Sequence, residues 1–167
     1  MRFPFWIKVL GKCSLWLSLS CCYAMEPLTL EHARTPDEIA WGLMQRRELP
    51  PNHGMLFYFD PPQRTTFWMF NTFIDLSLAL IDENLIIREI HELKAYPEMM
   101  RKLPPLTTLD QVKRISKSNS TVRFFYQNAA RSLFKVSYAL EMPAGWFTEN
   151  GIQVGDSLVD STEAAIE

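Results

Sequence analysis

The chain has 167 residues, of which 47% are hydrophobic and 22% are charged. This length suits one domain with a substantial core and is too short for two comfortable ones. The formal net charge of −2 excludes a bulk attraction to nucleic acid or to anionic lipid. The mean hydropathy of −0.09 excludes a polytopic membrane protein.

Residues 1–24 have the layout of a secretory signal peptide. An uncharged, mostly apolar run over residues 13–23 is followed by Ala24, a small residue before a cleavage point. The positive start of this leader consists of Arg2, Lys8 and Lys12. The run is shorter than the roughly 20 apolar residues that a membrane-spanning helix needs. We expect export to the periplasm or cell envelope, with an uncleaved N-terminal anchor as the alternative.

All three cysteines, Cys13, Cys21 and Cys22, lie in this leader. The residues before Cys21 and Cys22 loosely resemble a lipobox, so membrane tethering through a lipidated cysteine is a second alternative. Without the leader the domain has no cysteine, and therefore no disulfide, thiolate metal site or cysteine nucleophile.

The pattern from residue 25 to 160 predicts a single compact α+β domain that is rich in β-structure. We expect a small antiparallel or mixed sheet, or a barrel, with strands at 26–33, 55–59, 85–91, 136–142 and 153–159. Residues 67–69 and 74–81 are expected to be strands or extended segments. Residues 82–84 should form the turn of a hairpin, and Asp60-Pro61-Pro62 should end the strand before it.

Two short helices are expected beside these strands. The first begins with Thr35 as its cap, Pro36 in its first turn and Glu38 as the acid three residues after the cap. This helix should run to about Arg46. A second helix should cover residues 143–150, because Gly151 suits the position after a helix end.

Residues 98–135 differ from the rest in charge. They hold eight bases against two acids, whereas the remainder of the chain from Met25 holds six bases against 17 acids. This basic segment is expected to be a partly helical insertion, with a helix at 108–118 and either a helix or a strand and turn at 121–134. Its charges either lie along the acidic body or form a docking surface for an acidic partner or lipid head groups. Residues 161–167 should be a flexible acidic tail.

Standard catalytic motifs are missing from the sequence: there is no glycine-rich phosphate loop, no G-x-S-x-G and no H-E-x-x-H. The three histidines are far apart in sequence, so we predict no metal site and no cofactor. His91 lies between Glu89 and Glu92 and is either a general base or a strand-end histidine beside solvent.

Residues 64–82 set a few polar side chains among many aromatic ones. The candidate binding residues here are Trp68, Met69, Asn71, Thr72 and Asp75, to which we add His91. The polar members either satisfy backbone groups at a turn or face a groove rimmed by aromatic rings.

Several blocks of sequence follow one another in a recognisable order: Trp41-Gly-Leu-Met44 with Arg47 and Leu49, Gly54-Met-Leu-Phe57 with Phe59, Phe67-Trp-Met69, Asn71-Thr72, Asp75-Leu76, Ala79-Leu-Ile-Asp82, Ile90-His91, Ala139-Leu-Glu-Met-Pro-Ala-Gly-Trp146, Gly151-Ile152 and Val154-Gly-Asp156. Together they resemble the domain-of-unknown-function 192 family, also called uncharacterised protein family 0127. The resemblance implies a compact β-rich domain with short helices and frequent export in bacteria, but no activity. Phe70 stands where the family's F-W-M-K-N-T centre has lysine, and the basic segment replaces a short loop.

Two functions remain open from the sequence. The first is an exported, monomeric, non-catalytic domain that binds a small ligand or an envelope protein and no nucleic acid. The second is a hydrolase or transferase that uses Asp75 or His91 as its base.

Overall fold

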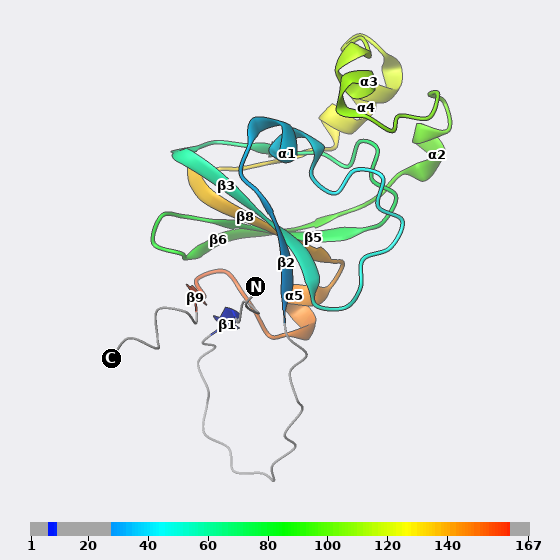
Figure 1. The fold of residues 1–167 in the computed structure, drawn as a ribbon. Coiled ribbons are helices and arrows are strands. Elements are labelled where there is room, and N and C mark those ends of the chain that lie inside the picture. The colour runs from blue at the N-terminus through cyan, green and yellow to red at the C-terminus, as the bar shows by residue number, and fades with distance from the viewer. Residues whose placement is uncertain (1–6, 10–27, 161–167) are drawn as a thin grey trace, which may run out of the picture.

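The computed structural model describes residues 7–9 and 28–160 (Figure 1). The three cysteines, most of the predicted leader and the predicted acidic tail at 161–167 lie outside the described residues.

A mixed five-stranded sheet forms the centre of the fold, in the order β2-β3-β8-β5-β6. Its strands are β2 (Thr29–Ala33), β3 (His53–Gln63), β8 (Val136–Pro143), β5 (Leu76–Ile81) and β6 (Ile87–Leu93). β2 pairs with β3 in parallel, and the other neighbours are antiparallel. The predicted α+β class is confirmed. The barrel alternative is wrong, because within residues 28–160 β2 and β6 remain the edges of an open sheet.

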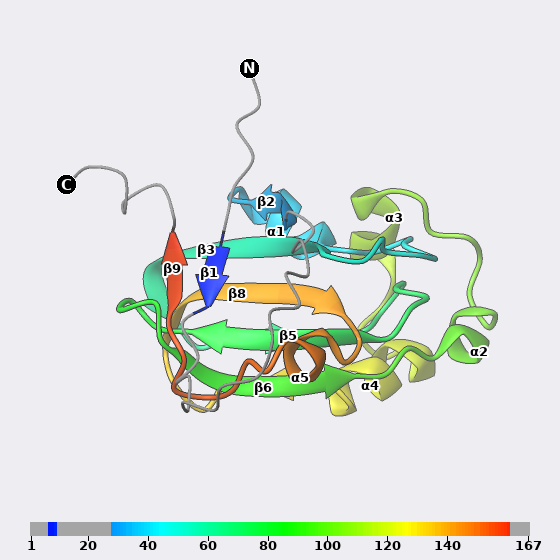
Figure 2. The ribbon, with the colours of Figure 1, turned by 90° about the horizontal axis from the view of Figure 1, so that it is seen from below.

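Both faces of the sheet are covered, which explains why all six residues of β5 are buried. One face carries Phe57, Leu78 and Leu80 and packs under the aromatic segment 67–73 and the basic segment. The opposite face carries Leu140 and Met142 and packs against α5 (Trp146–Glu149) and the residues after it. Figure 2 shows α5 on this second face.

Helix α1 (Pro36–Trp41) begins as predicted and ends earlier than predicted. The Thr35 hydroxyl accepts a hydrogen bond from the Glu38 amide, and the Glu38 carboxylate accepts one from the Thr35 amide. The helix stops at Gly42, before Arg46, because Gly42 has φ +49°. The Phe57 ring lies 3.3 Å from where a β-carbon would stand on Gly42. The predicted second helix is α5, and Gly151 follows it with φ +67°.

Three strand predictions need correction. Asp60-Pro61-Pro62 does not end β3, because the pairing of β3 with β8 shifts between Tyr58 and Gln63 and so tolerates residues without an amide donor. Of the predicted strand or extended segment at 67–69, only Phe67 belongs to a strand: β4 (Thr66–Phe67) stops before Trp68 and pairs with β7 (Ala130–Arg131). The predicted last strand at 153–159 is the shorter β9 (Leu158–Asp160), which pairs with β1 (Ile7–Val9) from the predicted leader.

The basic segment is partly helical, as predicted. It contains α3 (Leu109–Arg114), α4 (Ser120–Gln127) and most of α2 (Pro97–Met100). Residues 121–134 combine the two predicted alternatives, since α4 is followed by the two-residue strand β7. Phe125 of α4 packs edge-on against Phe70, with ring centroids 5.5 Å apart, and so joins the segment to the sheet.

The hairpin between β5 and β6 depends on Asp82. Its carboxylate accepts hydrogen bonds from the amides of Asn84 (2.9 Å) and Ile86 (3.0 Å), and from Arg88 Nε (2.6 Å). Burial acts to raise the pKa of Asp82, but these three hydrogen bonds and the Arg88 charge outweigh it and lower that pKa.

We predict that Asp82→Ala lowers the free energy of unfolding by about 1–3 kcal/mol, because two turn amides lose their acceptor. Urea denaturation measures this change. Glu83→Ala, at the neighbouring exposed position, is the matched control and should leave stability within about 0.5 kcal/mol. Equal stability of the two variants would contradict this role of Asp82.

Candidate functional site

A buried carboxyl group marks the most distinctive site in the structure. Glu141 lies on β8 opposite Met55 of β3 and Leu78 of β5, so its side chain points to the face that α1 and the aromatic segment cover. The residue is 6% exposed. Within residues 28–160 its carboxyl has no hydrogen bond and no ion pair.

Glu141 opens onto a cavity of about 190 Å³. Every fully enclosed side-chain oxygen or nitrogen in the described residues has a hydrogen-bond partner, so the unpaired Glu141 carboxyl must reach this open space. The walls come from residues 39–44 at the end of α1, Phe57, residues 65–68 and Thr72. The lining therefore combines aromatic rings, three threonines and one carboxyl, and it contains no lysine, arginine or histidine.

Burial raises the pKa of Glu141 to about 8. Removing a carboxylate from water disfavours its charged form, and no cation is near enough to offset this effect. At neutral pH the unliganded carboxyl is therefore mostly protonated, and it can both donate and accept a hydrogen bond.

Two of the sequence-predicted residues, Trp68 and Thr72, line this cavity together with Glu141. Met69 lies in the hydrophobic core and is 5% exposed. Trp68 and Thr72 therefore line the cavity while Met69 does not, because the chain turns after β4 and consecutive side chains point in different directions.

Asn71 connects two segments of the chain. Its side-chain oxygen accepts a hydrogen bond from Gln45 Nε2 (2.6 Å), and its side-chain nitrogen donates to the Leu106 carbonyl (3.0 Å). It is 1% exposed and has φ +61°. Asn71 also borders a separate hollow of about 270 Å³ next to α2. These contacts connect Asn71 to two segments that are distant in sequence, and its predicted role in binding stays a prediction.

Asp75 and His91 lie away from the cavity. The Asp75 carboxylate accepts a hydrogen bond from the Ala95 amide (2.7 Å). His91 Nε2 lies 3.0 Å from the Glu89 carboxylate, which also accepts from the Leu133 amide. Neither Asp75 nor His91 lines the Glu141 cavity or the hollow beside Asn71.

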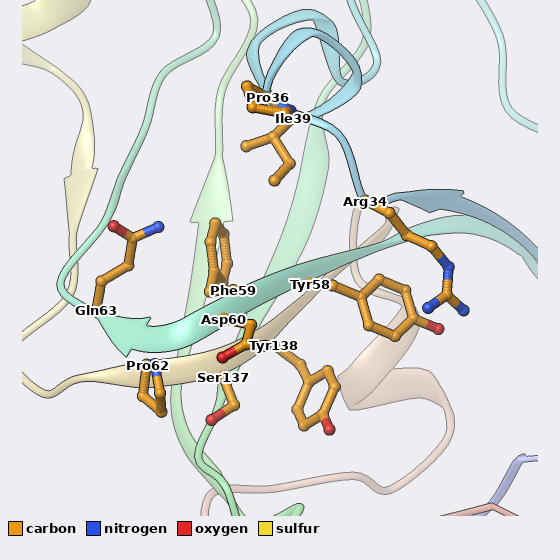
Figure 3. A pocket seen from close by; sticks show the side chains of 10 residues that line it. All are labelled: Arg34, Pro36, Ile39, Tyr58, Phe59, Asp60, Pro62, Gln63, Ser137 and Tyr138. Atoms are coloured by element: carbon orange, nitrogen blue, oxygen red, sulfur yellow. The ribbon is translucent and has the colours of Figure 1, made fainter.

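Another hollow in the described residues is an open groove of about 860 Å³ on the surface (Figure 3). Arg34, Tyr58 and Tyr138 lie at one end of it, and Gln63 lies at the other. The Arg34 guanidinium stands 3.8 Å from the centre of the Tyr58 ring, whose hydroxyl is 2.8 Å from His32 Nδ1. Burial, and then the Arg34 charge, lowers the pKa of His32. These polar groups are already engaged with one another, so the groove is a weaker candidate than the Glu141 cavity.

Sequence reasoning missed Glu141. The available signal was a single acid inside the apolar strand at 136–142, but alternation along one strand does not say that both faces of the sheet are covered. Within residues 28–160, no group of three or more potential ligands could hold a metal ion. No helix in the described part of the chain is long and apolar enough to cross a membrane.

We predict that the free energy of unfolding falls as pH rises from about 4.5 to about 8, because over this range the folded Glu141 keeps a proton that the unfolded chain releases. One pKa unit corresponds to about 1.36 kcal/mol, so the effect should amount to several kcal/mol. Urea denaturation of wild type and Glu141→Gln across this range measures it. The variant should lack this decline, and identical pH profiles for the two proteins would contradict the assignment.

We also predict that Asn71→Ala lowers the free energy of unfolding by about 2–4 kcal/mol, because Gln45 and Leu106 lose their partner and alanine disfavours positive φ. Asn71→Gly loses the same hydrogen bonds, but glycine adopts the positive φ without strain. The glycine variant should therefore be about 1 kcal/mol more stable than the alanine variant. Thermal and urea unfolding measure both variants. An alanine variant as stable as wild type would be inconsistent with this role.

Comparison with known proteins places the chain in a family. The model of the DUF192 family, described as "Uncharacterized ACR", matches residues 22–159. A crystal structure from Sinorhizobium meliloti 1021, described as a proposed transcription regulator, is 30% identical, with a TM-score of 0.58 over 81% of this chain and 84% of that one. A protein of unknown function from Novosphingobium aromaticivorans DSM 12444 is 26% identical, with a TM-score of 0.58 over 79% of this chain and 74% of that one. No curated protein matches the chain. Since the family model spans most of its length, the protein belongs to the DUF192 family.

Proposed function

We propose that this protein is a non-catalytic binding domain of the cell envelope whose Glu141 cavity binds a small organic cation. The observation that carries the proposal is a carboxyl group, 6% exposed, that lines a cavity without a hydrogen bond or ion pair in the described residues.

Charge favours a cation as the ligand. A buried carboxylate is costly unless an opposite charge or hydrogen-bond donors accompany it. The cavity lining offers no basic side chain, so a bound ammonium group would supply the missing charge and restore the ionised carboxylate.

The walls suit the same ligand. Phe57, Phe67 and Trp68 present aromatic surface to the cavity, and organic ammonium ions bind favourably against aromatic faces. The volume of about 190 Å³ is below the roughly 300–1,000 Å³ of pockets for drug-sized ligands, which supports a compact molecule.

Binding is better supported than catalysis. An acid–base mechanism needs a second group close to the reacting atoms, and the cavity contains one titratable side chain. Asp75 and His91, the predicted bases, are held in backbone and side-chain contacts elsewhere. The hydrolase or transferase alternative therefore has less support.

Export remains part of this proposal and rests on the leader sequence. Cleavage after Ala24 would remove β1, which pairs with β9 and takes no part in the five-stranded sheet. The cavity walls, which begin at Ile39, would be unaffected.

The test is calorimetric titration with choline and with its neutral isostere dimethylbutanol. Choline should bind more tightly, and its affinity should rise with pH through about 8, where Glu141 ionises. Glu141→Gln should weaken choline binding by at least about tenfold, the effect of losing a charge partner. Asp60→Asn removes a carboxyl from the open groove and should bind like wild type. Equal choline affinity in wild type and Glu141→Gln would contradict the proposal, and so would a failure of choline to bind to the wild type.

A further inference from the structure

A further hollow lies between the aromatic segment and the basic segment. It is a groove of about 550 Å³, within the range typical of ligand pockets. It is lined by Thr66, Trp68, Lys117, Val122, Arg123, Tyr126 and Gln127. We call it the α4 groove, because four of these residues belong to α4.

The groove has an apolar floor held by the core. Trp68 stacks on the buried Phe70 ring, with centroids 5.0 Å apart and planes 23° from parallel. Val122 is 9% exposed, whereas Tyr126 is 57% exposed. The groove thus leaves a large aromatic side chain in water beside buried apolar groups, as binding surfaces commonly do.

Two cationic side chains also line the groove, and neither is paired with an acidic side chain in the described residues. Lys117 and Arg123 are exposed, and in the described residues neither forms an ion pair. No acidic residue lines the groove. By contrast, Lys113 of the same basic segment pairs with Asp37 of α1 at 2.8 Å. Most of the segment's positive charge is therefore not neutralised by the acidic body.

We propose that the α4 groove binds a fatty acid, with its acyl chain on Trp68, Val122 and Tyr126 and its carboxylate between Lys117 and Arg123. The charge of the groove selects an anion, and its floor selects an apolar chain. Apart from the cations, the Tyr126 hydroxyl and the Trp68 indole N–H, the only polar side chains in the lining are Thr66 and Gln127, which is too few to satisfy the backbone of a bound peptide. This inference goes beyond the proposed function, and the two hollows share only Thr66 and Trp68.

The test is calorimetric titration of the full chain with dodecanoate below its micelle concentration. Dodecanoate should bind, and its affinity should fall as salt increases. Dodecanol and dodecyltrimethylammonium carry the same chain without the negative charge, and each should bind at least about tenfold more weakly.

Charge-reversed variants show whether binding occurs in this groove. Lys117→Glu combined with Arg123→Glu should weaken dodecanoate binding by at least about tenfold, while Arg114→Glu, an exposed base outside the groove, should bind like wild type. Both substituted cations are exposed, so the double variant should fold, and circular dichroism checks this. If folding is lost, the milder double variant Lys117→Gln with Arg123→Gln is measured instead. The proposal would be overturned if dodecanoate does not bind, or if dodecanol binds as tightly as dodecanoate. It would also be overturned if the double variant binds dodecanoate as tightly as wild type, or if an apolar peptide with a free carboxyl terminus binds more tightly than dodecanoate. None of these results depends on Glu141.

Discussion

The structure depends on the packing of the aromatic segment against one face of the sheet. Phe67 meets the Phe57 ring edge-on at 5.2 Å, and Phe70 meets Phe125 of α4 at 5.5 Å. This layer packs against β3, β5 and β8 on that side and connects the basic segment to the core. Because it also closes over Glu141, the same packing that stabilises the fold creates the unusual environment of that carboxyl.

The two hollows beside Trp68 follow from this arrangement. Trp68 is the first residue after β4, and it separates the cavity of Glu141 from the α4 groove. The cavity has a carboxyl without a cation, whereas the groove has two cations without an acid. The two hollows share only Thr66 and Trp68, and their other lining residues differ in chemistry, so each suits a different ligand.

Much of the fold could be predicted from local signals. The Thr35–Glu38 cap and the Asp82 hairpin turn are determined by neighbours in sequence, and both are present in the structure. The end of α1 at Gly42 and the passage of β3 through Pro61 and Pro62 depend on tertiary contacts with Phe57 and β8, so local propensity failed there. For the site, aromatic density indicated Trp68 and Thr72, but Glu141 became recognisable only once both faces of β8 were known to be covered.

Glu141 is a buried carboxyl that has no hydrogen bond and no ion pair within residues 28–160. Its titration can be followed directly by the carbon NMR shift of the side-chain carboxyl, assigned by comparison with Glu141→Gln. We predict a midpoint at about 8. A midpoint near 4.5, the ordinary value for glutamate, would mean that the group is solvated or paired, and it would contradict this assignment.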